Sequence, residues 1–328
     1  MNKNLYILAT IILALSVSSC YHEVDLDGYK DNDGKNLLTL NSLVCPDSTV
    51  AVSATRTYFF SDKHNERTYV QGLAIKLTIN GQEQETLSFD KSRNLYVSKF
   101  KPNEGNVVSI STDFDGKTIA GSDVVPRKTE ISDISVQRRG PVSIYTNRDF
   151  VFTYRLTFED KPNEDNYYFL QWDEVDSRAD VAMGERDFTH ELVFQKLADD
   201  VHETLPGWTP YCPYGLPFSD RGIDGQRHTI VVEEIVQGDE GSAQWRKPQM
   251  KRKFKLYSIS KQYYNYLVSV LLNQTDDKGL NGGMIDLGMA DPVKVYSNIT
   301  NGIGILGCYS TAQAEIDVFK EVGPFPGK

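Results

Sequence analysis

The 328-residue sequence predicts a mostly β protein, in which an N-terminal immunoglobulin-like or transthyretin-like sandwich precedes a larger antiparallel β domain with one amphipathic helix. Three observations carry this prediction. Apolar and polar residues alternate at period two in many short runs, turn dipeptides separate the runs, and helical periodicity is clear in a single segment near residue 265. Apolar residues make up 40% of the chain, which is too many for a disordered chain.

The N-terminal sandwich is expected to occupy residues 38–127. The dipeptides Asn80-Gly81 and Asp115-Gly116 favour the positive φ angles of two-residue hairpins, and no helical pattern interrupts the region. About seven short strands are typical of such a sandwich. The alternating runs that predict them include residues 49–60, 72–79, 86–89, 94–100, 107–112 and 117–124.

The second, larger β domain is expected over residues 128–320, because Pro126 and the polar residues after it are typical of a domain boundary. Its helix is predicted at 261–272, with Ser260 as the N-cap, and residues 321–328 are expected to form a tail. The apolar stripe of the helix consists of Tyr263, Leu267, Val270 and Leu271, and the main strand runs are 149–158, 166–175, 228–236 and 253–259.

The first residues are typical of a bacterial lipoprotein signal peptide. Residues 1–19 combine the cationic Lys3, an apolar stretch at 5–15 and small residues directly before Cys20. This pattern predicts that the Cys20 thiol carries diacylglycerol, including palmitate-type chains, and anchors the protein to the outer membrane, on its surface or its periplasmic face. An ordinary secretory peptide with an accidental cysteine is the alternative. The polar segment 20–37 is expected to be a flexible acidic tether.

The charge balance restricts the classes of partner. With 35 Lys and Arg against 45 Asp and Glu, the net charge is −10, which disfavours nucleic acid as a partner. After residue 19, no apolar run reaches the roughly 20 residues of a membrane-spanning helix.

A glycine motif near the C-terminus formally matches the dinucleotide-binding pattern GxGxxG, through Gly302, Gly304 and Gly307. Too few residues follow it to complete a dinucleotide-binding domain, so these glycines are expected to allow a bulged or tightly packed final strand. No cofactor is predicted. The histidines show no metal-binding spacing, and no metal site or catalytic residue is expected.

Two questions of side-chain chemistry stay open. Asp220, Asp224 and Glu233 or Glu234 could supply the paired carboxylates of a surface hydrolase that acts on a glycan or peptide. The three cysteines after Cys20 are Cys45, Cys212 and Cys308; they allow one disulfide, for which the pair Cys212–Cys308 is conceivable, or buried free thiols.

The loop at 205–218 is the candidate ligand-binding segment. Its prolines lower the entropy lost on binding, and flat aromatic rings suit sugars or peptides. The same loop could instead fold back as a lid over the core. Its aromatic residues are Trp208, Tyr211, Tyr214 and Phe218.

Three segments together resemble a known family. Residues 217–226 (PFSDRGIDGQ), 258–267 (SISKQYYNYL) and 292–310 (PVKVYSNITNGIGILGCYS) are similar to segments of the Bacteroidota lipoproteins that form family 4249 among the domains of unknown function. Leu306 stands where the family usually has Phe, and Cys308 where a small residue is common. The shared motif positions, expected to be structural, are Asp220, Gly225, Ser297, Asn298, Gly302, Gly304 and Gly307.

The resemblance implies an accessory role beside a TonB-dependent outer-membrane transporter in nutrient uptake, with a glycan, peptide or other nutrient as ligand. It supplies no catalytic or ligand-binding residue. An adhesin or structural module of the cell envelope is a further alternative to this role.

Overall fold

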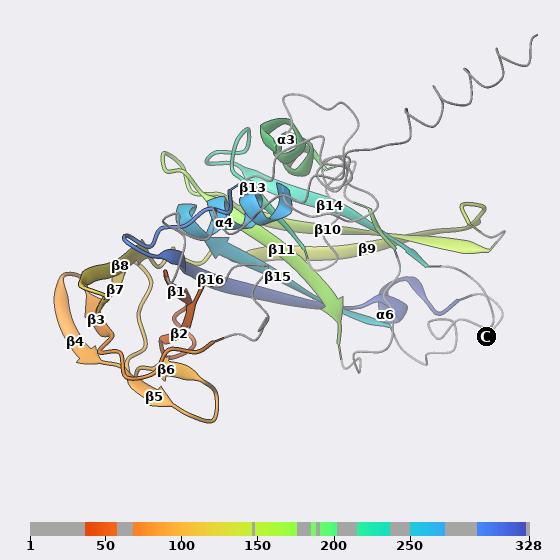
Figure 1. Cartoon of the computed structure of the whole chain (residues 1–328). Helices are drawn as coiled ribbons and strands as arrows, with labels where there is room; N and C mark the ends of the chain where they lie inside the picture. Colours follow the sequence, from red (N-terminus) through yellow and green to blue (C-terminus); the bar gives the residue numbers. More distant parts are fainter. Residues whose placement is uncertain are drawn as a thin grey trace, which may run out of the picture.

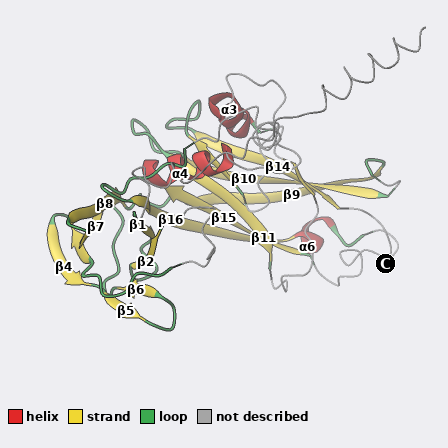
Figure 2. Ribbon diagram, in the orientation of Figure 1, coloured by secondary structure: helices red, strands yellow, loops and turns green. Residues whose placement is uncertain are grey.

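The computed structural model describes residues 37–57, 68–145, 148–175, 185–187, 191–201, 215–236, 250–272 and 294–325. Within them, three sheets form most of the body, and the helices lie at its periphery (Figure 2). The predicted fold class, mostly β with several antiparallel sheets, is confirmed. None of the helices in these ranges is long and apolar enough to cross a membrane.

The N-terminal part contains eight described strands in two layers that share one apolar core. Strands β4, β3, β7 and β8 form one antiparallel sheet, and β1, β2, β6 and β5 belong to another. The two predicted hairpin turns are present, because Asn80-Gly81 and Asp115-Gly116 all have positive φ angles. The strands are β1 (Leu38–Val44), β2 (Ala51–Arg56), β3 (Lys76–Ile79), β4 (Gln82–Thr86), β5 (Ser88–Asp90), β6 (Leu95–Val97), β7 (Val107–Phe114) and β8 (Lys117–Val124).

The C-terminal part packs a second four-stranded sheet, in the order β12-β14-β10-β9, against strands β13, β11, β15 and β16. Large aromatic side chains such as Trp172 and Phe254 fill the core between the sheets. The strands are β9 (Ile131–Val142), β10 (Asp149–Glu159), β11 (Tyr167–Glu174), β12 (Glu185–Asp187), β13 (Leu216–Ser219), β14 (Arg227–Val236), β15 (Lys251–Ile259) and β16 (Ile303–Asp317).

The last strand joins the two parts. β16 pairs in parallel with β1 through its first half and antiparallel with β15 through its second half, so that one eight-stranded sheet runs through the molecule (Figure 1). Leu306 and Cys308 of β16 are buried in the N-terminal core. Residues from the end of the chain therefore complete the core of the expected 38–127 sandwich.

Helix α4 spans Lys261–Leu272, the residues in which the sequence predicts a helix. The Ser260 hydroxyl accepts a hydrogen bond from the Tyr263 backbone N–H at 3.1 Å, as an N-cap side chain does. The sequence did not predict two further helices, α3 (Leu192–Val201) and α6 (Val318–Val322).

The segment expected to be a tail contributes to the core. Phe325 is buried, and its ring contacts Phe150, Phe152 and Phe319 at centroid distances of 5.2, 6.0 and 5.3 Å. The chain after β16 therefore folds back through α6 and closes one end of the C-terminal core.

Candidate functional site

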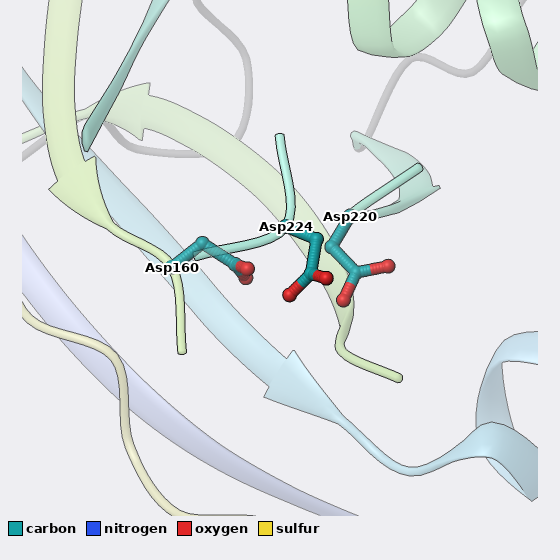
Figure 3. Close-up of side chains that lie close together, drawn as sticks. All are labelled: Asp160, Asp220 and Asp224. Carbon is teal, nitrogen blue, oxygen red and sulfur yellow. The ribbon is translucent and has the colours of Figure 1, made fainter. Parts of the chain in front are cut away.

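Three carboxyl groups that are distant in sequence meet at one end of the C-terminal part. Asp160 follows β10, and Asp220 and Asp224 lie in the turn between β13 and β14 (Figure 3). One oxygen atom of each carboxyl group lies within 4.8 Å of the other two. Asp160 is buried, Asp220 is half-buried and Asp224 is exposed, so the cluster runs from the core to the surface.

Each of these carboxyl groups accepts a hydrogen bond from the backbone of a neighbouring turn. Asp160 accepts from the Gly225 N–H at 2.8 Å, and its other oxygen accepts from the Tyr168 hydroxyl at 2.5 Å. Asp220 accepts from the backbone N–H of Asn166 at 2.7 Å, and Asp224 from that of Asn163 at 3.1 Å. The cluster thus ties the turn after β10 to the turn after β13.

Burial raises the pKa of Asp160 and of Asp220 above the ordinary aspartate value, and the neighbouring carboxylates of the cluster raise it further. Three carboxylates at this spacing have the chemistry to bind a hard cation such as Ca²⁺. Ca²⁺ takes six to eight oxygen ligands, more than these three side chains supply, and each of the three already accepts a hydrogen bond from the backbone of a turn. The contacts in the structure assign the cluster a structural role.

The structure does not bring the other two candidate carboxylates into this cluster. Glu233 and Glu234 lie on β14, where Glu233 accepts a hydrogen bond from the Thr153 hydroxyl at 2.8 Å. Glu234 is fully buried and forms an ion pair with Arg252, with N–O distances of 2.8 and 2.9 Å. Asp220 and Asp224 therefore pair with Asp160, a residue that the sequence analysis did not single out.

Of the candidate ligand-binding aromatics, only Phe218 lies in the described part of the chain. Its side chain is fully buried on β13 and stacks on Tyr168 at 5.2 Å, so it belongs to the core and offers no exposed contact. Trp208, Tyr211 and Tyr214 lie outside the described residues, as do Cys20 and Cys212. Cys45 and Cys308 are buried free thiols.

The closing motif connects the last strand to the N-terminal part. Asn298 binds β16 twice: its Oδ1 accepts from the Leu306 N–H at 2.9 Å, and its Nδ2 donates to the Leu306 carbonyl at 2.8 Å. The same Nδ2 lies 3.3 Å from the carbonyl of Ser122 on β8. Ser297 accepts a hydrogen bond from the backbone N–H of Ile299 at 3.2 Å. These contacts of Ser297 and Asn298 hold backbone of β8, of β16 and of the segment before β16.

The three glycines of the motif lie where the backbone of β16 comes close to its neighbours. A Cβ atom at Gly302 would lie 2.7 Å from the Leu38 carbonyl oxygen, and one at Gly304 would lie 2.0 Å from that of Leu40. At Gly307 the neighbour is the Tyr263 side chain of α4, at 3.0 Å. These glycines therefore permit the parallel pairing with β1 and the packing of α4.

Glu191 is another buried acid that the sequence patterns do not single out. Glu191 precedes α3 and is buried; it lies 2.9 Å from His228 Nε2 and accepts a hydrogen bond from the Val231 N–H at 2.7 Å. No spacing rule links residues 191 and 228, because only the packing of α3 against the sheet brings them together.

A family model, described as a domain of unknown function (DUF4249), matches residues 22–315. The chain belongs to this family. The match confirms the family that the three sequence segments predict, and the DUF4249 region includes the aspartate cluster, the closing motif and all of the described strands except the last residues of β16. A search of curated proteins finds none that matches the chain.

Proposed function

We propose that the protein is a lipid-anchored, non-catalytic component of the outer membrane that presents a nutrient ligand or a partner surface to a TonB-dependent transporter. The observation that carries this proposal is the pattern around Cys20, in which a cationic start, an apolar stretch and small residues precede a cysteine. Such a cysteine accepts a diacylglycerol group and then forms the N-terminus of the mature protein.

The position of the folded part fits an anchored role. The first described strand begins at Leu38, so 17 residues separate it from Cys20. Fully extended, this segment would span about 60 Å at roughly 3.5 Å per residue. The β domains could therefore stand clear of the lipid headgroups and reach the mouth of a neighbouring transporter.

The contacts of the candidate carboxylates argue against a hydrolytic role. A glycosidase holds two carboxyl groups on either side of the scissile bond, free to exchange protons with the substrate. Here Asp220 and Asp224 hold turns, and Glu234 is paired with Arg252 in the core. These three contacts leave the hydrolase alternative without an assigned pair of acids.

Mass spectrometry of the protein from native membranes tests the lipid anchor. We expect the N-terminal peptide of the mature chain to begin at Cys20 and to carry the mass of its acyl chains, and a Cys20→Ala variant to leave the membrane fraction. An unmodified Cys20, or a chain that retains Met1 in the cytosol, would overturn the proposal.

Affinity purification tests the partner. The anchored protein, extracted in mild detergent, is expected to co-purify with a β-barrel transporter, and deletion of its gene is expected to reduce uptake of the corresponding nutrient. Purification without any such partner, together with unchanged uptake in the deletion strain, would argue against the accessory role.

A further inference from the structure

A groove lies where the N-terminal part meets α4. Its volume is about 490 Å³, within the roughly 300–1,000 Å³ typical of small-molecule sites. One wall is the end of β8 and the segment after it, with Asp123 and Arg127; the other walls are the turn before β11, with Lys161, and the start of α4, with Ser260 and Lys261. The residues that line the groove thus come from both parts of the molecule.

Asp123 is the buried acid of this groove, with only 7% of its surface exposed. Its Oδ2 accepts hydrogen bonds from the Ser260 hydroxyl at 2.5 Å and from the Cys308 backbone N–H at 2.8 Å. Both donors are neutral groups. Among the described residues, none of the ion pairs includes Asp123.

A buried carboxylate without a cation is costly, because burial removes water and nothing of opposite charge replaces it. Accordingly, burial raises the pKa of Asp123 from 3.8 to about 6, against the opposing effect of its hydrogen bonds. Another buried acid of the protein, Glu234, is by contrast paired with Arg252. A ligand cation would therefore gain more interaction free energy by pairing with Asp123 than by pairing with an exposed acid.

The rim of the groove carries charges of both signs. Glu164 and Asp165 line it together with Arg127, Lys161 and Lys261. The Lys161 ammonium donates to the Arg127 carbonyl at 2.9 Å, and the Lys261 ammonium lies 3.5 Å from Asp165. The described contacts leave the Arg127 guanidinium available to an anionic group.

We propose that this groove binds a free amino acid or short peptide, whose ammonium group pairs with Asp123 and whose carboxylate faces Arg127 and Lys161. A ligand with both charges matches the groove. Asp123 would repel a purely anionic ligand, and the three rim cations would repel a purely cationic one. The inference gives a ligand class to the capture role proposed above and rests on that role for its meaning in the cell.

Binding of this kind is linked to protons. An ammonium group pairs with the ionised form of Asp123, so affinity is expected to fall as pH drops below about 6. The other titratable or charged groups that face this site are Arg127 after β8, Lys161, Glu164 and Asp165 in the turn before β11, Tyr167 on β11, Lys261 on α4 and Cys308 on β16. A purely structural Asp123 would give no such dependence of ligand affinity on pH.

The test uses the full chain purified in detergent and isothermal titration with trialanine, triserine and trilysine. Each is compared with its N-acetylated form, which lacks the terminal ammonium, and with its C-terminal amide. We expect N-acetylation to weaken binding by at least about tenfold, amidation to weaken it less, and affinity to drop between pH 7.5 and 5. Binding of N-acetylated peptides as tightly as free ones, or no binding of any tripeptide at about 10 mM, would overturn the proposal.

Three variants separate ligand binding from folding. Asp123→Asn removes the charge, whereas Asp115→Asn is the matched control, because Asp115 lies in an exposed hairpin turn of the same sheet. Val124→Trp narrows the groove from its exposed wall without touching the bonds of Asp123. We expect Asp123→Asn and Val124→Trp to lose affinity at least about tenfold and Asp115→Asn to keep it. Normal affinity in Val124→Trp would refute the groove as the site, even if Asp123→Asn fails to fold. Because the titration needs neither acylation nor a transporter, its failure is distinguishable from failure of the lipid-anchor proposal.

Discussion

The substitution Gly304→Ala is expected to weaken the join between the two parts of the protein. Gly304 lies on β16 with φ at +117°, and an added Cβ would lie 2.0 Å from the Leu40 carbonyl oxygen of β1. An ordinary contact begins near 3.4 Å, so the strands would have to separate by about 1.4 Å. The Leu40 carbonyl and the Gly304 Cα that would carry the new atom both belong to paired backbone, so the clash cannot be relieved by rotation of a flexible side chain.

The expected loss follows from two contributions. Positive φ costs a residue with a Cβ about 1–2 kcal/mol relative to Gly. Separating β1 from β16 at Leu40–Gly304, the second of their six paired positions, would break about two or three backbone hydrogen bonds, each contributing about 1 kcal/mol. The free energy of unfolding should therefore fall by about 3–5 kcal/mol, which corresponds to a lower melting temperature by on the order of 10 °C.

Urea denaturation followed by tryptophan fluorescence measures this loss, and two glycines provide matched controls. Gly72 has φ at +80° but open space around its Cβ position, so Gly72→Ala reports the conformational cost alone. A Cβ atom added at Gly302 would lie 2.7 Å from the Leu38 carbonyl oxygen, and the φ angle of Gly302 is not positive. Gly302→Ala therefore reports the cost of the close approach alone. If Gly304→Ala proves no more destabilising than Gly72→Ala, the argument from the β1–β16 contact is refuted.

Three further predictions concern buried groups. Because burial raises the pKa of folded Asp123 to about 6, its contribution to stability is present below pH 4 and is lost as pH rises toward 6. The loss should be about 3 kcal/mol. Thermal melts across this pH range should show it in the unmodified protein and not in Asp123→Asn. Arg252→Met should cost about 3–5 kcal/mol in urea denaturation because it removes the guanidinium that pairs with the buried Glu234 carboxylate, and Glu234→Gln in the same chain should restore part of the loss; equal stability of the single and double variants would contradict this. Phe325→Ala should cost about 3–5 kcal/mol because it opens a cavity beside Phe150, and calorimetry that finds no change would show that the chain end is not part of the core.

Local patterns predicted those elements whose own residues determine their conformation. The Asn-Gly and Asp-Gly dipeptides favour the positive φ angles that both turns have, and Ser260 supplies the cap of α4 from the adjacent residue. β9 escaped prediction because it is an edge strand with Val136 as its one buried residue, so its sequence lacks the alternation that indicates a half-buried strand.

The candidate site was predictable only in part. Asp220 and Asp224 lie four residues apart, and their proximity follows from the turn that contains them. Asp160 joins them from the turn after β10, and its selection among the 45 acidic residues requires knowledge of the strand order. Phe218 illustrates the opposite case, because an aromatic residue next to a proline-rich loop has the same sequence whether it faces a ligand or the core.

The sequence by itself determined the fold class, the family and the expectation of a lipid anchor, because alternation, turn dipeptides and the residues before Cys20 act over short distances along the chain. Only the tertiary structure decided that β16 completes the N-terminal core and that Asp123 is buried against Ser260 and Cys308. These contacts join residues more than a hundred positions apart. Their formation depends on which strands pair, and the pairing is set by the packing of the whole core rather than by any local pattern.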